Sequence, residues 1–413
     1  MAPPPPPPRR PPDLMEEIFE EMLLRFPPDD PASLVRAALV SKRWCRLIAG
    51  SRFRRRFREL HRAPPILGFI CNVLMRVRNM DRQHKARFVP TSSCLTQADC
   101  PRWRAFDARH GRVLLYRCAD FSQGEDWLHP FIVWDPVTGE ELQLPSLPMD
   151  RCYPFPVGFN AAVLCAGGHL DGHFLVVFVG MYPDGMVAYE YSSEAGVWSE
   201  PTILQRPCEY VDLVPAAVVG NAVYFRFDDG TRILKYDLGT REMGFNTSQY
   251  DSIPLNTTQN EQALERIILM TTDEGRLGFT MVDYNCKLYL WSMEVVGPRD
   301  DAVWTQDRVI ELRDFLPADE LLSEPCVLGY VNGHGAIFVG TKDGFYTIDL
   351  KSNQTKKVGR GLACMKNSNE DIFYGHNYVI SDMCLLFPYT SFLFPALEAV
   401  SATAGPSAGA SGA

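Results

Sequence analysis

Residues 12–60 read PDLMEEIFEEMLLRFPPDDPASLVRAALVSKRWCRLIAGSRFRRRFREL, and this stretch sets the class of the N-terminal part of the chain. Residues that favour helix starts recur at short intervals, and apolar residues stand three and four positions apart between them, which predicts three or four short helices. The expected start positions are Asp13 with Glu16 at capping-box spacing, Asp30 before Pro31, Ser41, and Ser51 after the closing Gly50. A unit of about fifty residues buries only a small core and commonly depends on a partner.

Several landmarks of this stretch occur together in one known module. They are Pro12-Asp13-Leu14, Glu17-Ile18, Pro28, Ser33-Leu34, Val40-Ser41-Lys42-Arg43-Trp44 and Phe53. Their combination resembles the F-box, a helical module that docks on the SKP adaptor of a cullin-based ubiquitin ligase. The chain departs from the usual pattern at Pro11-Pro12, where an F-box commonly opens with Leu-Pro. A generic helical cap on the following domain is the alternative interpretation.

The resemblance also implies which residues would contact the SKP-type adaptor. Matched position by position, they are Leu14, Ile18, Leu23, Pro28, Leu34, Val40 and Trp44. Through the adaptor, a cullin and a RING subunit would join the complex.

From about residue 64 the apolar pattern changes from helical to strand spacing, and one sequence pattern repeats several times. A glycine opens an apolar strand, a turn follows, a second strand carries an anchor side chain, and a polar turn leads to another strand. The opening glycines are Gly111, Gly172, Gly220, Gly275 and Gly335, and the anchors are Trp134, Tyr191, Tyr236, Trp291 and Ile348. A strand-rich unit that repeats at about 50 residues is typical of a propeller blade, so we expect an all-β propeller.

Five blades are visible in this way, and the two ends of the domain indicate a sixth. Residues 65–72 and 86–90 at the start, with 371–389 at the end, would supply its strands and close the ring, which removes exposed sheet edges. We predict six blades, with seven as the alternative. The domain also resembles the kelch-like associated domain that follows many plant F-boxes, through HRAPPILGFICN at 61–72 and the turn at 134–139.

Nothing in the sequence indicates secretion or membrane insertion. The N-terminus, MAPPPPPPRRPP, lacks the apolar core of a signal peptide. The most apolar window, residues 161–181, is interrupted by His169, Asp171 and His173. The 12 cysteines include no C-x-x-C pair, which favours reduced thiols. We therefore expect a protein of the cytoplasm, the nucleus or both.

Basic residues outnumber acidic ones in the first 120 residues, and acidic residues dominate the remainder. The local extreme is residues 51–60, where five arginines surround Phe53 and Phe57. Because the two phenylalanines fall on one helical face, we expect the arginines on the solvated face. Nucleic-acid binding or nuclear import is the alternative, and it is not favoured because no aromatic platform for base stacking accompanies the arginines.

Sequence motifs of catalysis are not found. There is no G-x-x-x-x-G-K-[ST] loop, no H-E-x-x-H and no G-x-G-x-x-G after a strand. The G-x-S-x-G match at 405–409 lies in a tail of small residues, not between a strand and a helix. His169 and His173 stand in an expected turn and are not assigned as metal ligands. We therefore predict a non-enzymatic protein without a metal or cofactor.

The loops between second and third strands of the blades are expected to share one face of the ring with the connections between blades. Acidic residues are frequent in these loops, which span 118–129, 181–185, 226–230, 283–287 and 340–344. We predict that this face binds a client protein with a basic patch, using Trp127, Asp184, Asp228, Asp229 and Asp343. The alternative is that aspartate before glycine is simply favourable in turns.

The sequence thus predicts a small all-α F-box module followed by an all-β propeller. The expected parts are a disordered proline-rich leader (1–11), the F-box module (12–62), the propeller (63–395) and a disordered tail (396–413). The predicted function is client recognition in an SCF-type ubiquitin ligase, either as an active receptor or as a decoy. The alternative is a propeller scaffold, or a carbohydrate- or small-molecule-binding protein, without a ligase role.

Overall fold

The structure is a computed structural model, and it describes residues 16–61, 63–76, 82–92, 95–117, 131–148, 158–165, 172–182, 185–205, 210–227, 232–246, 267–296, 301–322, 325–341, 344–360, 385–392 and 394. The chain divides into two compact units. The helical unit contains Met1–Pro65 and Ser391–Ala413, and the second unit contains Ile66–Thr390. The two units meet in the sequence between Pro65 and Ile66, and again between Thr390 and Ser391.

Four helices lie in the described part of the helical unit, within the predicted three or four, and the first expected start, Asp13, lies outside the described residues. The helices are α1 (Glu16–Leu24), α2 (Pro31–Val40), α3 (Lys42–Ala49) and α4 (Ser51–His61). Ser41 caps α3, because its hydroxyl accepts a hydrogen bond from the Trp44 N–H at 3.2 Å. Asp30 precedes α2 but makes no side-chain hydrogen bond to the backbone there. Its carboxylate instead accepts from the Ser33 hydroxyl, so the predicted cap is replaced by a side-chain contact.

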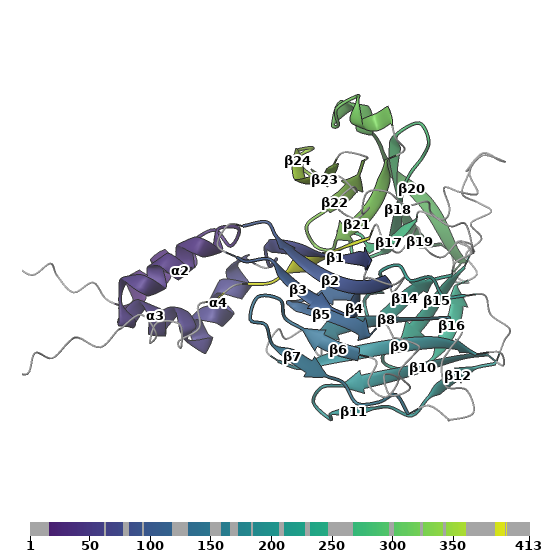
Figure 1. The fold of residues 1–413 in the computed structure, drawn as a ribbon, viewed down its shortest axis with the longest axis horizontal. Helices are drawn as coiled ribbons and strands as arrows, with labels where there is room; N and C mark the ends of the chain where they lie inside the picture. The colour runs from purple at the N-terminus through teal and green to yellow at the C-terminus, as the bar shows by residue number, and fades with distance from the viewer. Residues whose placement is uncertain are drawn as a thin grey trace, which may run out of the picture. The chain divides into compact units, whose positions relative to one another are not determined.

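Six antiparallel sheets form the second unit, and each is one blade of a propeller (Figure 1). Blade 1 consists of β25 (Leu386–Thr390), β1 (Ile66–Arg76), β2 (Arg82–Pro90) and β3 (Ala98–Pro101). Blade 2 consists of β4 (Trp103–Arg109), β5 (Arg112–Arg117), β6 (Phe131–Trp134) and β7 (Glu141–Gln143). Blade 3 consists of β8 (Gly158–Cys165), β9 (Phe174–Tyr182) and β10 (Gly185–Ser192), with β11 (Val197–Trp198) and β12 (Thr202–Leu204) both paired to β10. Blade 4 consists of β13 (Ala217–Val219), β14 (Ala222–Arg226), β15 (Ile233–Asp237) and β16 (Met243–Asn246). Blade 5 consists of β17 (Ile268–Thr271), β18 (Leu277–Val282), β19 (Lys287–Val296) and β20 (Asp301–Glu311). Blade 6 consists of β21 (Cys326–Val331), β22 (Ala336–Gly340), β23 (Gly344–Asp349) and β24 (Thr355–Arg360). Two 3-10 helices, η3 (Leu312–Asp314) and η4 (Glu320–Leu322), lie between blades 5 and 6.

The ring closes through blade 1, which combines the two ends of the propeller sequence. Strand β25 pairs with β1, and Figure 1 shows the yellow β25 beside the dark blue β1. First strands of neighbouring blades contact one another, including β25 with β4 and β21 with β25. The prediction of six blades with a sixth built from both ends is confirmed, and the alternative of seven is wrong. Closure matters because backbone hydrogen bonds between β25 and β1 complete the sheet of blade 1 from both ends of the propeller sequence.

The repeating glycines and anchors occupy equivalent places in five blades. Each glycine immediately or closely precedes the second strand of its blade and has a positive φ, for example 75° at Gly111 and 61° at Gly335. Glycine adopts this left-handed conformation without steric cost, which explains its return at these turns. Each anchor lies in the third strand of its blade.

The turn after the third strand repeats with less regular sequence. In blades 2, 3, 4 and 6 one residue of this turn has a positive φ, namely Gly139, Gly196, Arg241 and Asn353. The N–H of each donates to the carbonyl four residues earlier, as from Arg241 to Asp237 at 2.8 Å. The fold therefore imposes the same turn on glycine and non-glycine residues, at a steric cost for arginine.

Among the described residues, no helix has the length and apolar character needed to cross a membrane.

Candidate protein-binding surfaces

The helical unit carries a large share of the exposed apolar side chains of the described residues. Among the described residues, twelve large apolar side chains are exposed, and five of them belong to the four short helices. These five are Ile18, Met22, Leu39, Val40 and Leu60, with exposures of 48%, 46%, 58%, 68% and 56%. Apolar side chains concentrated on so small a unit indicate a surface that another protein covers.

Helix α1 has an apolar side chain on both faces. Ile18 and Met22 stand four residues apart and are exposed, whereas Leu23 is fully buried. Phe19 lies between these faces and contacts the Trp44 ring with centroids 5.4 Å apart, which joins α1 to α3. The helix therefore contributes to the core of the unit and still presents apolar area outward.

Charged residues join α1 to α4. Arg56 of α4 donates to Glu20 at 2.8 Å and also to Glu21. These hydrogen bonds raise the pKa of the Arg56 guanidinium above its usual value. The His61 Nε2 lies 2.9 Å from the Leu24 carbonyl oxygen, at the end of α1. The position of α1, and of the apolar side chains on it, thus depends on α4.

The structure places the predicted adaptor-contacting residues in three groups. Ile18 and Val40 are exposed, as a contact with a partner requires. Leu23 and Leu34 are buried, at 0% and 2% exposure, and belong to the core of the helical unit. Pro28 and Trp44 are half-buried, and Leu14 lies outside the described residues. The predicted contacts with an adaptor stay predictions, and the burial of Leu23 and Leu34 assigns these two side chains to holding the helices together.

Two exposed residues, Met22 and Leu39, were missed as candidate contacts by reasoning from sequence. Met22 stands one helical turn after Ile18, so this spacing was the available signal. Leu39 directly precedes Val40 at the end of α2, where no periodicity distinguishes an inward from an outward side chain.

The core of the helical unit is completed by residues from the far end of the chain. Phe392 and Phe394 pack against the buried Phe57 of α4, with ring centroids 5.9 and 5.7 Å away. The guanidinium groups of Arg54 and Arg58 lie 5.3 and 5.6 Å from the centre of the Phe394 ring. We call Phe392 and Phe394 the aromatic pair. No pattern within residues 12–60 indicates this contribution.

On the propeller, the strand order places the loops predicted to bind a client. The ends of the second strands and the starts of the third strands, which flank these five loops, lie at one end of the blades, together with the ends of the fourth strands and the starts of the first strands. Ile66 and Thr390, the first and last residues of the ring, pair at the opposite end, where the Gly111 N–H donates to the Thr390 carbonyl at 2.9 Å. The predicted client-binding face is therefore the one away from the chain ends of the propeller.

The residues predicted to bind a client cannot be described individually. Trp127, Asp184, Asp228, Asp229 and Asp343 all lie outside the described residues, so their roles stay predictions. One acidic residue of the same loops, Asp283, is described. Its carboxylate accepts the backbone N–H groups of Asn285 and Lys287 at 2.9 and 2.8 Å, which is a turn-forming role.

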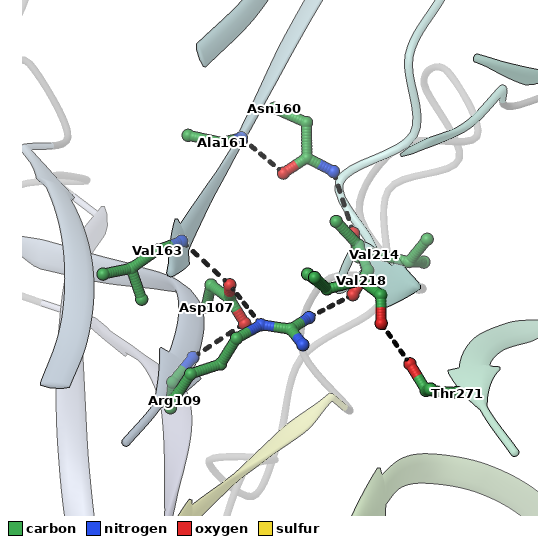
Figure 2. A network of polar contacts seen from close by, with 10 residues as sticks. Asp107, Arg109, Asn160, Ala161, Val163, Val214, Val218 and Thr271 are labelled. Carbon is green, nitrogen blue, oxygen red and sulfur yellow. Dashed lines mark hydrogen bonds and ion pairs between the residues drawn. The ribbon is translucent and has the colours of Figure 1, made fainter. Parts of the chain in front are cut away.

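Polar contacts between inner strands hold neighbouring blades together (Figure 2). The buried Asp107 of β4 accepts from the Val163 N–H of β8 at 3.0 Å and from Arg109 at 2.8 Å. Burial raises the pKa of the Asp107 carboxyl even though Arg109 opposes the change. Arg109 also donates to the Ala216 carbonyl next to β13, so this pair links blades 2, 3 and 4.

The same kind of contact recurs around the ring. The fully buried Asn160 of β8 donates to the carbonyls of Asp212 and Val214, at 2.7 and 2.8 Å. The Thr271 hydroxyl of β17 donates to the Val218 carbonyl of β13 at 2.6 Å. These buried and half-buried polar groups have their partners within the fold, so we assign them to structure rather than to ligand binding. In the part of the chain that the structure describes, no group of three or more potential metal ligands is found.

Comparison with known protein families finds a match for the helical unit. Residues 11–56 match the family model of the F-box domain. No curated protein sequence matches the chain.

Solved structures match the chain only weakly. TolB from Acinetobacter baumannii is 12% identical with a TM-score of 0.38, and the match covers 75% of this chain and 71% of TolB. A chain from a study of two prolyl endopeptidases is 13% identical with a TM-score of 0.36, and the match covers 68% of this chain but only 38% of that one. Hsv2 from Kluyveromyces lactis is 9% identical with a TM-score of 0.32, and the match covers 58% of this chain and 72% of Hsv2. At these TM-scores the likenesses carry no information on function. The chain thus consists of a helical F-box domain followed by a six-bladed β-propeller.

Proposed function

We propose that this protein is a client-recognition subunit of an SCF-type ubiquitin ligase. The observation that carries the proposal is the F-box match at residues 11–56 on a unit that exposes five large apolar side chains. An SKP-type adaptor would cover part of this apolar area and would connect the chain to a cullin and a RING subunit. Burial of apolar area is the main source of such association.

In this proposal the chain makes and breaks no covalent bond. Its propeller holds a client protein while the F-box holds the adaptor, so the client's lysines are kept near the conjugating enzyme. Tethering raises the effective concentration of the two reactants, which accelerates transfer without a catalytic group on this chain. We further propose that the propeller is of the kelch-like type associated with plant F-box proteins and that the protein acts in the cytoplasm or nucleus.

The client would bind at the propeller face that carries the second-to-third strand loops. Support comes from the strand order, in which the strand ends that flank these loops lie away from Ile66 and Thr390. The acidic residues of these loops would attract a basic patch on the client. Trp127, Asp184, Asp228, Asp229 and Asp343 remain the proposed contacts.

The adaptor interface is tested with the double variant Ile18→Glu/Val40→Glu. Both side chains are exposed, at 48% and 68%, so the substitutions should change the free energy of unfolding by less than about 0.5 kcal/mol. Binding to a purified SKP-type adaptor, measured by calorimetry, should fall at least about a hundredfold, because two charges would be buried against apolar area. The matched control is Leu142→Glu, at a propeller residue with 46% exposure. Unchanged adaptor affinity in the double variant would overturn the proposal.

A second experiment uses the same variants to find the client. Tagged wild-type chain and Ile18→Glu/Val40→Glu chain are purified from cells, and the bound proteins are identified by mass spectrometry. Adaptor and cullin should appear with the wild-type chain alone, and a client should appear with both. A wild-type chain that captures neither adaptor nor cullin contradicts a ligase role.

A further inference from the structure

The aromatic pair stands outside the F-box match yet belongs to the core of the helical unit. Phe392 and Phe394 follow the propeller's closing strand β25, which ends at Thr390. Both rings face Phe57 edge-on, with interplanar angles of 87° and 79°. Edge-to-face packing is a favoured arrangement of aromatic rings and adds to the stabilisation from burial.

Three further contacts fix this segment to the helical unit. The Ser391 N–H donates to the Pro65 carbonyl at 3.2 Å. The guanidinium groups of Arg54 and Arg58, one helical turn apart on α4, both lie over the Phe394 ring. A cation placed over an aromatic face is attracted by the negative face of the ring. Phe57, Arg54 and Arg58 thus engage one segment from the opposite end of the chain.

Helix α4 transmits this support to the apolar surface. Phe57 anchors α4 in the core, and Arg56, the residue directly before it, binds Glu20 and Glu21 of α1. Helix α1 in turn carries Ile18 and Met22, the exposed side chains proposed to meet the adaptor. The path from the aromatic pair to the apolar surface therefore runs through one helix and one group of ion pairs.

We infer that the aromatic pair positions the adaptor-binding surface, so that adaptor binding requires an intact segment directly after the propeller's closing strand. The inference rests on the proposed function for its adaptor part. Residues 386–390 close the ring, and Ser391, Phe392 and Phe394 contribute contacts to the helical unit. One stretch of the chain therefore contributes to both units, and a chain that lacks it would have neither a closed propeller nor a complete helical unit. The adaptor would then recruit complete receptors in preference to truncated ones.

The test compares full-length wild-type chain with Phe392→Ala/Phe394→Ala. Hydrogen exchange of the amides in α1 and α4 should become at least about tenfold faster, which corresponds to about 1.4 kcal/mol, while exchange in blades 2 to 6 stays unchanged. Affinity for a purified SKP-type adaptor should fall by about tenfold or more. A full-length Phe392→Leu/Phe394→Leu variant keeps the apolar volume and should restore the adaptor affinity to within about threefold of wild type.

The surface variant Ile18→Glu/Val40→Glu separates positioning from direct contact. It should lose adaptor binding with wild-type exchange in α4, whereas the alanine variant should lose binding with accelerated exchange. Wild-type exchange in α1 and α4 of the alanine variant would overturn the inference, and so would accelerated exchange with unchanged adaptor affinity. A wild-type chain that does not bind the adaptor would overturn the proposed function and the adaptor part of the inference. In that case, the exchange data still decide whether the aromatic pair holds α4.

A chain ending at Thr390 provides a second variant. It keeps β25 and therefore the closed ring, but it lacks Ser391, Phe392 and Phe394. Its exchange in α4 and its adaptor affinity should match those of the alanine variant. If this shortened chain binds the adaptor as tightly as wild type, the segment after β25 is not needed for positioning and the inference fails.

Discussion

The helical unit and the propeller differ in how they bury their apolar side chains and pair their polar ones. The propeller closes its ring of six sheets through blade 1 and pairs buried polar groups across neighbouring blades, as at Asp107 and Asn160. The helical unit has a small core, takes two aromatic side chains from beyond the propeller and still exposes Ile18 and Val40. The difference indicates that a large ring can bury much of its own apolar area, whereas a small helical unit draws core residues from another segment of the chain.

The largest effect is expected from breaking the propeller's own contacts. Asp107→Ala removes the partner of Arg109 and leaves the Val163 N–H without its acceptor. Loss of one member of a buried ion pair costs about 3–5 kcal/mol, so the midpoint of urea unfolding of the propeller should fall clearly. Asp107→Asn is the control, because its amide oxygen can still accept from Val163 and its cost should be smaller. Equal midpoints for wild type and Asp107→Ala would show that the propeller does not depend on this junction.

Two neighbouring residues of α1 allow a buried side chain to be compared with an exposed one within the helical unit. Leu23 is fully buried and Met22 is 46% exposed, although they are adjacent in sequence. Leu23→Ala should destabilise the helical unit by about 2–5 kcal/mol, because it empties part of a small core. Met22→Ala should change stability by less than about 0.5 kcal/mol and weaken adaptor binding instead. Hydrogen exchange of α2 and α3, together with calorimetry on the adaptor, separates the two outcomes; a reversed pattern would contradict the assigned faces of α1.

The smallest effect concerns the outer part of blade 1 and its pH dependence. Burial opposes ionisation of Asp99, but hydrogen bonds from Arg87 and Lys85 prevail and lower the pKa of its carboxyl below the usual 3.8. Because the folded-state pKa is lowered, the stabilisation is complete above pH 3.8 and is lost as the pH falls through the folded-state value. Wild type should therefore be more stable than Asp99→Asn at pH 6, and the two melting temperatures should converge as the pH falls toward 2. A constant difference across this range would exclude the ionised carboxylate as the source.

Local sequence accounts for most of the secondary structure and for the number of blades. Ser41 before α3 acts as a cap because its hydroxyl reaches an N–H within three residues. Gly111 and its counterparts recur because a tight turn before the second strand needs a positive φ. The F-box landmarks are likewise contained within residues 12–60 and are matched by the family model at 11–56. Such features depend on neighbours in sequence, so they can be read without the fold.

Contacts between distant residues were decided by the tertiary structure. The sequence could not show that Phe392 and Phe394 complete the core around Phe57, because more than 300 residues separate them and only ring closure brings the segment back. It could not distinguish the exposed Val40 from the buried Leu34, since both are apolar residues of one short helix. Arg241 adopts a turn conformation that suits glycine because the blade on either side fixes the backbone. Local chemistry thus determines which elements form, and packing between remote elements determines which side chains remain available to a partner.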